Sequence, residues 1–384
     1  MNNIIKKFIS FAVAITLTGT GTLSTRFIRT KSDILLKANA SITDYIRLND
    51  NTDSVDGLTS LIDNYISSVH SVIEKISEYT RYQNQISFRF ASKEEGKELM
   101  LSNKEYYDGF SQNELEYKMQ KKNAEMEEYL SFAGDQVMEF TDYEKAFISS
   151  HFKSMESKLR IKGYTLPPID EIVLIKTTMQ EEGGAAGYTH GTQIYIQDAL
   201  LEGALNGSLV SRAMYIDYLD KFFWHELFHC LTRNNPDFRT EMYKLIHFTV
   251  AEEDFALPPS VFEYHISNPD VEHHNAYASF HIGDENIDCF IDSVTTKHFE
   301  KGETFFEFMT PVLVPTDGSD IYYMPEQSDN FYDIFGRNTD YVDDPEECMA
   351  DNFSYALKYG ILGENGNGYP NPEIIEGILS YLRK

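Results

Sequence analysis

Two histidines and a glutamate in the run His225-Glu226-Leu227-Phe228-His229 are the residues most able to do chemistry. On an α-helix, positions i and i+4 share a face, so both imidazoles can reach one metal ion. Zinc readily accepts nitrogen ligands, and Glu226 lies at the edge of this face, within reach of a water on the metal. The metal lowers the pKa of that water to roughly 7, and the glutamate takes its proton during attack on a carbonyl. The motif therefore predicts one zinc ion bound by His225 and His229, with Glu226 as the general base.

Two histidines and a water leave zinc one protein ligand short, and three regions downstream contain candidates. These candidates are Asp237, Glu241 and His247 soon after the motif, His273 and His274 further on, and Glu347 near the C-terminus. A third histidine six residues after His229 would mark one large class of such enzymes, but position 235 is asparagine. That class is therefore excluded.

Helix geometry favours Glu347 as the third ligand. Glu347 and Asp351 are spaced i, i+4 on a predicted helix that opens at Pro345, a residue accepted in a first helical turn. Glu347 can ligate the metal while Asp351 accepts a hydrogen bond from the outer nitrogen of a ligating histidine. Glu346 has no such partner, because position 350 is alanine. The alternative is that Glu346 and Glu347 only complement the helix dipole.

The oxyanion that forms on a scissile carbonyl needs a hydrogen-bond donor besides the metal. Tyr341 is the first candidate, because it lies six residues before Glu347, in a loop that enters the predicted ligand helix. Competing donors are His273, His274 and Tyr277. We expect His190 to be a surface residue and Trp224 to pack the histidine helix.

The elements that must position these residues form an α+β pattern. Residues 32–162 are predominantly helical in pattern, with Asn113–Leu130 as an exposed helix. The elements predicted after them are strands at Ile172–Ile175, Ala185–Thr189 and Ile194–Ile196, a helix at Leu209–Leu231, strands at Ala278–Ile282, Ile287–Thr295 and Phe305–Val314, and helices at Pro345–Tyr359 and Pro372–Leu382. The chemistry thus falls in the second half of the chain.

The composition is that of an acidic protein, with 33 basic and 61 acidic residues among 384 and a formal net charge of −28. This excess argues against nucleic acid as a partner, because no cationic surface would meet the phosphates. Lys6 and Lys7 precede the apolar run Phe8–Leu17, which is typical of a signal peptide and too short to cross a bilayer. We predict a secreted or extracytoplasmic protein, with an uncleaved N-terminal anchor as the alternative. Cys230, Cys289 and Cys348 form no metal-binding pair, and we expect them to be buried and reduced.

The histidine pair followed by Glu347-x-x-x-Asp351 resembles the gluzincin metallopeptidases, the thermolysin-like clan. The resemblance covers roughly residues 141–359 and implies a zincin fold, with a small twisted sheet, a helix with the two histidines and a second helix with the glutamate. It also implies that an edge strand, here Ala185–His190, binds an extended peptide, although this segment can equally be an ordinary hairpin strand. The 118 positions from His229 to Glu347 (347 − 229) are far more than in thermolysin.

Further short motifs, Tyr188-Thr189-His190-Gly191, Asn268-Pro269-Asp270 and Asn338-Thr339-Asp340-Tyr341, make the whole set similar to a group of bacterial zinc peptidases. We therefore expect a signal peptide or anchor at 1–30, a helical domain at 31–140 and a zincin-like metallopeptidase domain at 141–384. The leading hypothesis is an exported zinc peptidase acting on a peptide or protein substrate. The alternatives are a zinc-binding protein without turnover that uses its helical N-terminal half to bind a partner, and a hydrolase of a small amide or a cell-wall peptide.

Overall fold

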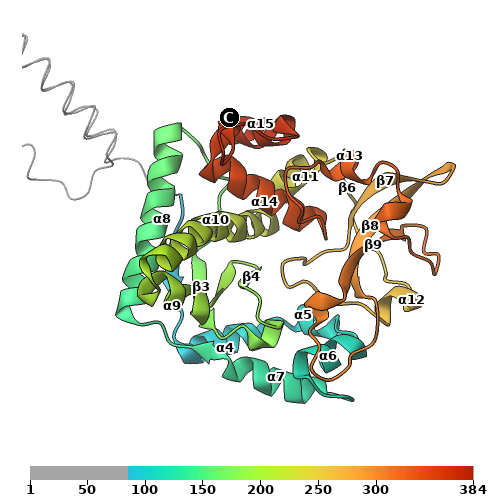
Figure 1. Cartoon of the computed structure of the whole chain (residues 1–384), viewed down its shortest axis with the longest axis horizontal. Coiled ribbons are helices and arrows are strands. Elements are labelled where there is room, and N and C mark those ends of the chain that lie inside the picture. Colours follow the sequence, from blue (N-terminus) through green and yellow to red (C-terminus); the bar gives the residue numbers. More distant parts are fainter. Residues whose placement is uncertain (1–84, 384) are drawn as a thin grey trace, which may run out of the picture. The chain divides into compact units, whose positions relative to one another are not determined.

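The computed structural model describes residues 85–383, and the compact unit that contains them begins at Gln85 (Figure 1). The predicted signal peptide or anchor at 1–30 lies outside the described residues. Within those residues, no helix is both long and apolar enough to cross a membrane. Helices and sheets are mixed throughout the unit, so the α+β class predicted from the sequence is confirmed.

The first sheet has five strands, with β4 (Gly187–His190) at one edge. The strand order is β1 (Phe88–Phe90), β3 (Ile172–Thr177), β5 (Gln193–Gln197) and β4. The first three are mutually parallel, whereas β4 pairs antiparallel with β5. The short strand β2 (Val137–Met138) pairs antiparallel with the end of β3. The three strands predicted between residues 172 and 196 are therefore confirmed.

Helices cover both faces of this sheet, as the alternation of side chains along β3 requires. Ile172 and Leu174 belong to the main hydrophobic core, whereas Val173 and Ile175 belong to a second one. The main core includes residues of α8 (Asp142–Lys162), α9 (Asp198–Asn206) and α10 (Leu209–Asn234). The second core includes residues of α4 (Lys93–Ser102), α5 (Lys104–Asp108), α6 (Gln112–Met119) and α7 (Met126–Asp135).

Residues 85–140 thus complete the sheet and one of its covering layers. The strands β1 and β2 both pair with β3, so this segment belongs to the same compact unit as the rest. The predicted boundary between a helical domain and a catalytic domain near residue 141 is therefore misplaced. Helical periodicity alone could not reveal it, because the pairing partners of these short strands lie far along the chain.

The predicted exposed helix Asn113–Leu130 is wrong, because this segment forms α6 and α7 and most of α6 is buried. Glu114 and Lys118 are fully buried, and the Lys118 ammonium lies 3.1 Å from Glu114 and also bonds Glu182 of η1 (Gln180–Glu182). Charged residues are rarely buried unless they are paired, so the sequence pattern alone suggested an exposed surface. The pairing ties α6 to the segment that follows β3.

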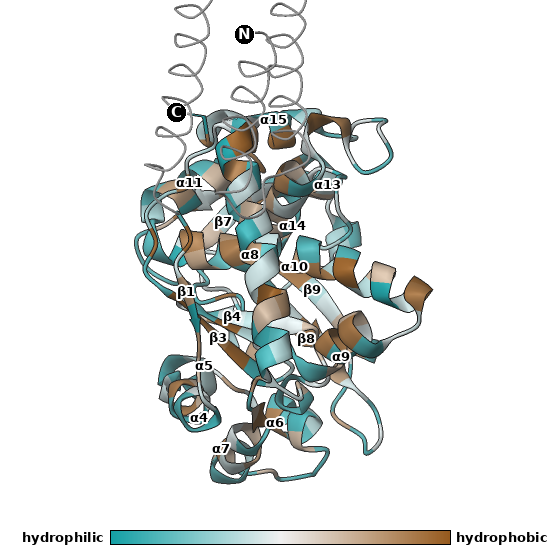
Figure 2. Ribbon diagram, turned by 90° about the vertical axis from the view of Figure 1, so that its left-hand side faces the viewer, coloured by the Kyte–Doolittle hydropathy of each residue, from teal (hydrophilic) through white to brown (hydrophobic). Residues whose placement is uncertain are grey.

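Helix α10 is buried only in its C-terminal half. Ser208 caps its first turn, and Leu209 and Val210 project from the unit with 86% and 71% of their surface exposed (Figure 2). The buried residues of the helix begin at Leu219. Trp224 is fully buried, which confirms its predicted packing role. The histidine motif therefore lies on the half that the core holds rigid.

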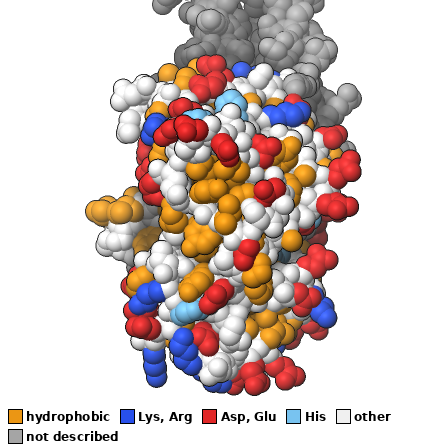
Figure 3. All heavy atoms as spheres, turned by 90° about the vertical axis from the view of Figure 1, so that its right-hand side faces the viewer, with side chains coloured by type: hydrophobic (Ala, Val, Ile, Leu, Met, Phe, Trp, Pro, Cys, Tyr) orange, Lys and Arg blue, Asp and Glu red, His pale blue; other side chains and the backbone are white. Residues whose placement is uncertain are grey.

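The long segment between the two predicted metal-ligand helices folds into a second sheet. Its order is β6 (Thr249–Val250), β7 (Ala276–Ile282), β8 (Glu285–Thr295) and β9 (Met309–Pro315), all antiparallel. The predicted strand at Phe305–Val314 is correct only from Met309, because Phe305–Glu307 forms the 3-10 turn η2. Short helices accompany the sheet at α11 (Pro236–Lys244), α12 (Pro259–Phe262) and α13 (Phe331–Phe335), with a further 3-10 turn, η3, at Pro325–Gln327. On the face with α12 and this sheet, hydrophobic side chains gather centrally and acidic ones lie around much of the margin (Figure 3).

The chain ends in α14 (Pro345–Lys358), the 3-10 turn η4 (Gly360–Leu362) and α15 (Pro372–Tyr381). Helix α14 packs along α10 and is buried along most of its length. The Asp344 side chain caps it by accepting a hydrogen bond from the Glu346 amide at 2.7 Å. This packing sets one face of α14 against the histidine face of α10.

Replacing Lys118 by methionine is expected to lower the free energy of unfolding by about 3–5 kcal/mol, because it leaves two buried carboxylates without their cation. Chemical denaturation of the full chain measures the change. The matched control is Lys121→Met, since Lys121 pairs with Glu128 at the surface and its side chain is 51% exposed. The control should cost less than about 1 kcal/mol. Equal effects of the two substitutions would contradict a structural role for the buried pair.

Candidate metal centre

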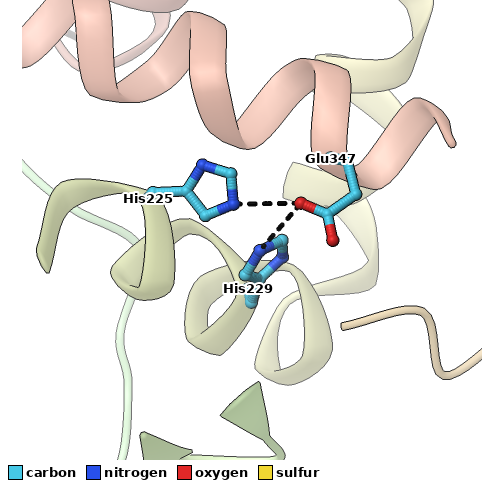
Figure 4. Close-up of side chains that lie close together, drawn as sticks. All are labelled: His225, His229 and Glu347. Atoms are coloured by element: carbon cyan, nitrogen blue, oxygen red, sulfur yellow. Dashed lines mark hydrogen bonds and ion pairs between the residues drawn. The ribbon is translucent and has the colours of Figure 1, made fainter. Parts of the chain in front are cut away.

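Helices α10 and α14 bring the side chains of His225, His229 and Glu347 together (Figure 4). The Glu347 Oε2 atom lies 3.0 Å from His225 Nε2 and 3.7 Å from His229 Nε2. One ligand atom from each residue lies within 4.8 Å of the other two. The histidine pair shares one face of α10, as its i, i+4 spacing predicts, and Glu347 meets that face from the first turn of α14.

The outer nitrogen of each histidine faces a carboxylate. His225 Nδ1 lies 3.0 Å from Asp351, and His229 Nδ1 lies 3.0 Å from Glu346. An ionised carboxylate only accepts, so each imidazole donates its Nδ1–H and keeps a lone pair on Nε2. Both lone pairs then point toward the Glu347 carboxylate, and the buried His229 Nε2 atom has no hydrogen-bond partner among residues 85–383. Acceptors that face one another are stabilised by a cation between them, so these residues could hold a metal ion.

Asp351 is held in place from several sides. Its carboxylate accepts a hydrogen bond from Thr339 at 2.6 Å and lies 2.9 Å from the ammonium of Lys221. The hydroxyl of Tyr355 lies 3.3 Å away. The structure therefore places Asp351 behind His225, at the position that the i, i+4 spacing with Glu347 predicts. Its surroundings fix the orientation of the imidazole through the carboxylate.

Glu346 holds the other histidine, a role that the sequence analysis did not assign to it. Besides His229, its carboxylate accepts hydrogen bonds from Thr232 at 2.6 Å and from the Tyr243 hydroxyl. The i, i+4 rule predicts no partner for Glu346, because the residue one turn along the helix is Ala350. Neighbouring residues of a helix point about 100° apart, so adjacent carboxylates can serve two different histidines. The Glu346–Glu347 pair was the signal available in the sequence.

The loop before β7 supplies two further residues to the centre. The Asn268 amide donates to Glu347 Oε1 at 2.6 Å, which leaves Oε2 for the histidines. Asp270 Oδ1 lies 3.9 Å from His229 Nε2 and accepts a hydrogen bond from the Thr189 amide at 2.7 Å. The motif Asn268-Pro269-Asp270 was part of the resemblance, but no spacing rule gave its residues a role. These residues belong to the long segment between α10 and α14, and helix geometry cannot predict contacts across such a sequence distance.

Glu226 is buried beside the histidines and touches the edge strand. Its Oε2 accepts a hydrogen bond from the Thr189 hydroxyl at 2.6 Å. Its carboxylate, the His229 ring and Asp270 each offer a ligand atom within 4.8 Å of the others. Burial raises the pKa of Glu226, and the nearby imidazoles partly offset that rise. A carboxylate with a raised pKa next to a candidate metal position is suited to accept a proton.

Acidic groups outnumber basic ones around the centre. The acidic groups are Glu226, Asp270, Asp343, Asp344, Glu346, Glu347 and Asp351, and the basic groups are Lys221, Arg233 and Arg239. Burial and the charges of Glu226 and Glu347 raise the pKa of Asp270 well above its ordinary value. Burial lowers the pKa of His225, but Asp351 and Glu347 more than reverse this and raise it well above its usual range. The site thus stabilises positive charge between the imidazoles and Glu347, as a divalent cation would supply.

Tyr341 lies at the open side of the centre. Its ring is nearly parallel to that of His225, with centroids 6.1 Å apart and 9° between the planes. It lines a cavity of about 80 Å³ together with Gly187, Asn268 and Asp270. Burial and the charge of Glu347 raise the pKa of its hydroxyl well above the ordinary value, so this group stays protonated and able to donate.

The other candidates from the sequence lie elsewhere. Asp237, Glu241 and His247 are exposed, and within the described residues none of them joins the histidine pair in a possible metal group. His273 lies 3.2 Å from Asp254. The competing donor Tyr277 packs against the small core around Phe290. The three cysteines are free and buried, as predicted.

The prediction that His190 is a surface residue is wrong. Only 4% of its surface is exposed, and its ring packs against Tyr106, Tyr188 and Tyr195. Burial lowers the pKa of His190 well below its usual value, so the ring is neutral. A short segment next to a glycine suggested exposure, but helices α4–α7 cover this face of β4.

Comparisons of the chain with known protein families, with curated proteins and with solved structures found no match. The chemistry of the centre is therefore inferred from its own residues and their geometry.

Replacing Glu346 by glutamine is expected to weaken zinc binding at the centre by roughly 10- to 100-fold, because His229 loses the charge that fixes its tautomer and raises its basicity. Competition with a chromophoric chelator measures the affinity. Glu376→Gln on the exposed face of α15 is the matched control and should leave the affinity unchanged. An unaltered affinity in Glu346→Gln would show that this carboxylate serves only the packing of α14.

Proposed function

We propose that residues 85–384 form a zincin-like catalytic domain and that the chain is an exported zinc-dependent peptidase. His225, His229 and Glu347 would hold one zinc ion, and Glu226 would act as the general base. The observation that carries the proposal is the convergence of these three ligand atoms next to Glu226, at the edge of a sheet. Export remains an expectation from the N-terminal sequence.

Zinc at this centre would supply the Lewis acidity that polarises a carbonyl and lowers the pKa of a water. The residues of the chain would do the rest. Glu226 would take a proton from the attacking water on one carboxylate oxygen while Thr189 holds the other at 2.6 Å. Because the pKa of Glu226 is raised by burial, the carboxyl can afterwards pass this proton to the leaving amine. Tyr341 would donate to the developing oxyanion.

The edge strand β4 would bind the backbone of the substrate. Gln197 donates to the Ala186 carbonyl, so by the alternation of antiparallel pairs Tyr188 faces β5, and the backbone groups of Gly187 and Thr189 point outward. The outward groups of Thr189 are already bonded, its amide to Asp270 and its carbonyl to Arg233 at 2.7 Å. Gly187 is therefore the position at which an extended peptide can pair with the strand.

The lack of a side chain at Gly187 fits this role. A Cβ atom there would come within 2.4 Å of Phe222 of α10 and 2.5 Å of the Tyr195 carbonyl, so the strand lies close to the histidine helix. Gly187 also lines the cavity that contains Tyr341 and Asp270. A peptide bonded to Gly187 would thus pass between the edge strand and the proposed oxyanion donor, beside the metal centre.

Replacing Glu226 by glutamine is expected to keep zinc bound and to lower peptide hydrolysis by roughly 10²- to 10⁴-fold, because the amide cannot accept the proton. A library of quenched fluorescent peptides measures turnover, and elemental analysis measures zinc. The control Glu202→Gln lies on the exposed face of α9 and should behave as wild type.

Two results would overturn the proposal. One is wild-type protein without stoichiometric zinc. The other is hydrolysis that Glu226→Gln leaves unchanged. Zinc binding without hydrolysis across the library would instead favour the alternative, a zinc-binding interaction protein whose N-terminal half binds a partner. Hydrolysis of small amides or cell-wall peptides alone would keep the mechanism and change the substrate.

Replacing Tyr341 by phenylalanine keeps the ring beside His225 and removes the hydroxyl. We expect kcat to fall by roughly 10²- to 10³-fold with little change in KM, because the donor would act on the transition state rather than on the ground state. Zinc content should stay the same. Tyr332→Phe on α13 is the matched control, since this tyrosine is 44% exposed. A wild-type kcat in Tyr341→Phe would exclude the tyrosine as the oxyanion donor.

A further inference from the structure

A second group of metal-binding residues lies outside the centre described above. His265, His274 and Asp292 each offer a ligand atom, and these atoms lie within 4.8 Å of one another. Asp292 is on β8, and its Oδ2 lies 2.9 Å from His265 Nδ1 while its Oδ1 lies 3.9 Å from His274 Nδ1. The side chains of Asp292 and His265 are only 1% and 3% exposed. Two imidazoles and a carboxylate are a common ligand set for zinc and other borderline divalent ions.

The hydrogen bonds around His265 determine which of its nitrogens is free. Glu114, paired with Lys118, accepts a hydrogen bond from the Ser267 hydroxyl at 2.9 Å. Ser267 has thereby used its proton, so it accepts from His265 Nε2–H, which lies 3.0 Å away. The other nitrogen, Nδ1, then faces the Asp292 carboxylate. A lone pair against a carboxylate oxygen at 2.9 Å is unfavourable, so this position holds either a second proton or a metal ion.

His274 distinguishes the two possibilities. Its Nδ1 is buried and has no hydrogen-bond partner within the described residues, although it points to the same carboxylate. A proton on His265 would satisfy Asp292 but leave the buried His274 Nδ1 atom unpaired, which is unfavourable. A metal ion would use the lone pairs of both imidazoles and the carboxylate at once.

The group also has an entry path and an open side. His265 and His274 line a cavity of about 750 Å³, together with Ser267, His190, Phe262 and Glu272. A metal ion held by three protein ligands needs water in its remaining positions, and this cavity can supply it. The Nε2–Ser267–Glu114 chain would in turn fix the His265 tautomer, as the carboxylates behind ligating histidines commonly do.

We propose that His265, His274 and Asp292 form a second site for a borderline divalent cation, for which Zn²⁺ is the first probe. The ten-residue loop from His265 to His274 has both of its ends in this group. Between them lie Asn268 and Asp270, which contact Glu347 and the edge strand. A cation here would therefore join the two ends of the loop that completes the first centre. The second site does not depend on peptidase activity, so it stands or falls separately from the proposed function.

Metal stoichiometry of the full chain tests the proposal. We expect two equivalents of Zn²⁺ after dialysis and elemental analysis of the wild-type protein. The double variant His225→Ala/His229→Ala should keep one equivalent, and adding His274→Ala to it should reduce this to none. His273→Ala is the matched control, because this neighbouring histidine is 55% exposed and faces Asp254. It should keep both equivalents. Co²⁺ substitution provides a second readout through its visible absorption.

Circular dichroism shows whether each variant is folded. If the variant with His274→Ala is not, Asp292→Asn provides the same test, because the amide keeps the shape of the side chain and removes its charge. One equivalent in the wild type and none in the double variant would overturn the second site. One equivalent in both proteins would instead leave the second site standing and overturn the first centre. The two failures are therefore distinguishable.

Discussion

Two buried imidazole–carboxylate hydrogen bonds across the α10–α14 interface determine the rest of the site. Most of this interface is buried, and buried polar groups need hydrogen-bond partners. Asp351 and Glu346 meet this requirement for His225 and His229. In doing so they fix both tautomers and turn both Nε2 atoms toward Glu347. The packing of the two helices and the arrangement of the candidate metal ligands therefore depend on the same contacts.

The insertion between the two helices acts on the centre through one loop. Asn268 directs the Glu347 carboxylate, and Asp270 holds the amide of Thr189 on the edge strand. The second sheet supports both ends of this loop. His265 forms a β-bridge with β8, and the other end of the loop continues through Asn275 directly into β7. The long segment between His229 and Glu347 thus forms one wall of the site. It does not separate the candidate ligands in space, because α10 and α14 pack directly together.

The sequence predicted those parts of the site that depend on local periodicity. The i, i+4 rule placed His225 with His229 and Glu347 with Asp351, and apolar runs located the strands that precede α10. Features that depend on tertiary contacts escaped it. Glu346 serves a histidine on another helix, and His190 is buried because helices α4–α7, between residues 93 and 135, cover its strand. Lys118 looked exposed because only one of its two carboxylate partners, Glu114, is local, whereas the other, Glu182, is 64 positions away. In each case the deciding contact joins segments whose proximity no local pattern encodes.

Thr189 connects the proposed general base, Glu226, with the strand proposed to bind the substrate, β4. Its hydroxyl bonds Glu226, and its outward amide and carbonyl bond Asp270 and Arg233. The proposed base is thus positioned by the same strand that would bind the substrate, so strand and base keep a fixed relation. The saturation of Thr189 also limits substrate pairing to Gly187 and the residues before it. A substrate would gain few backbone hydrogen bonds from such a short edge, so the contacts of its side chains would have to supply the remaining affinity.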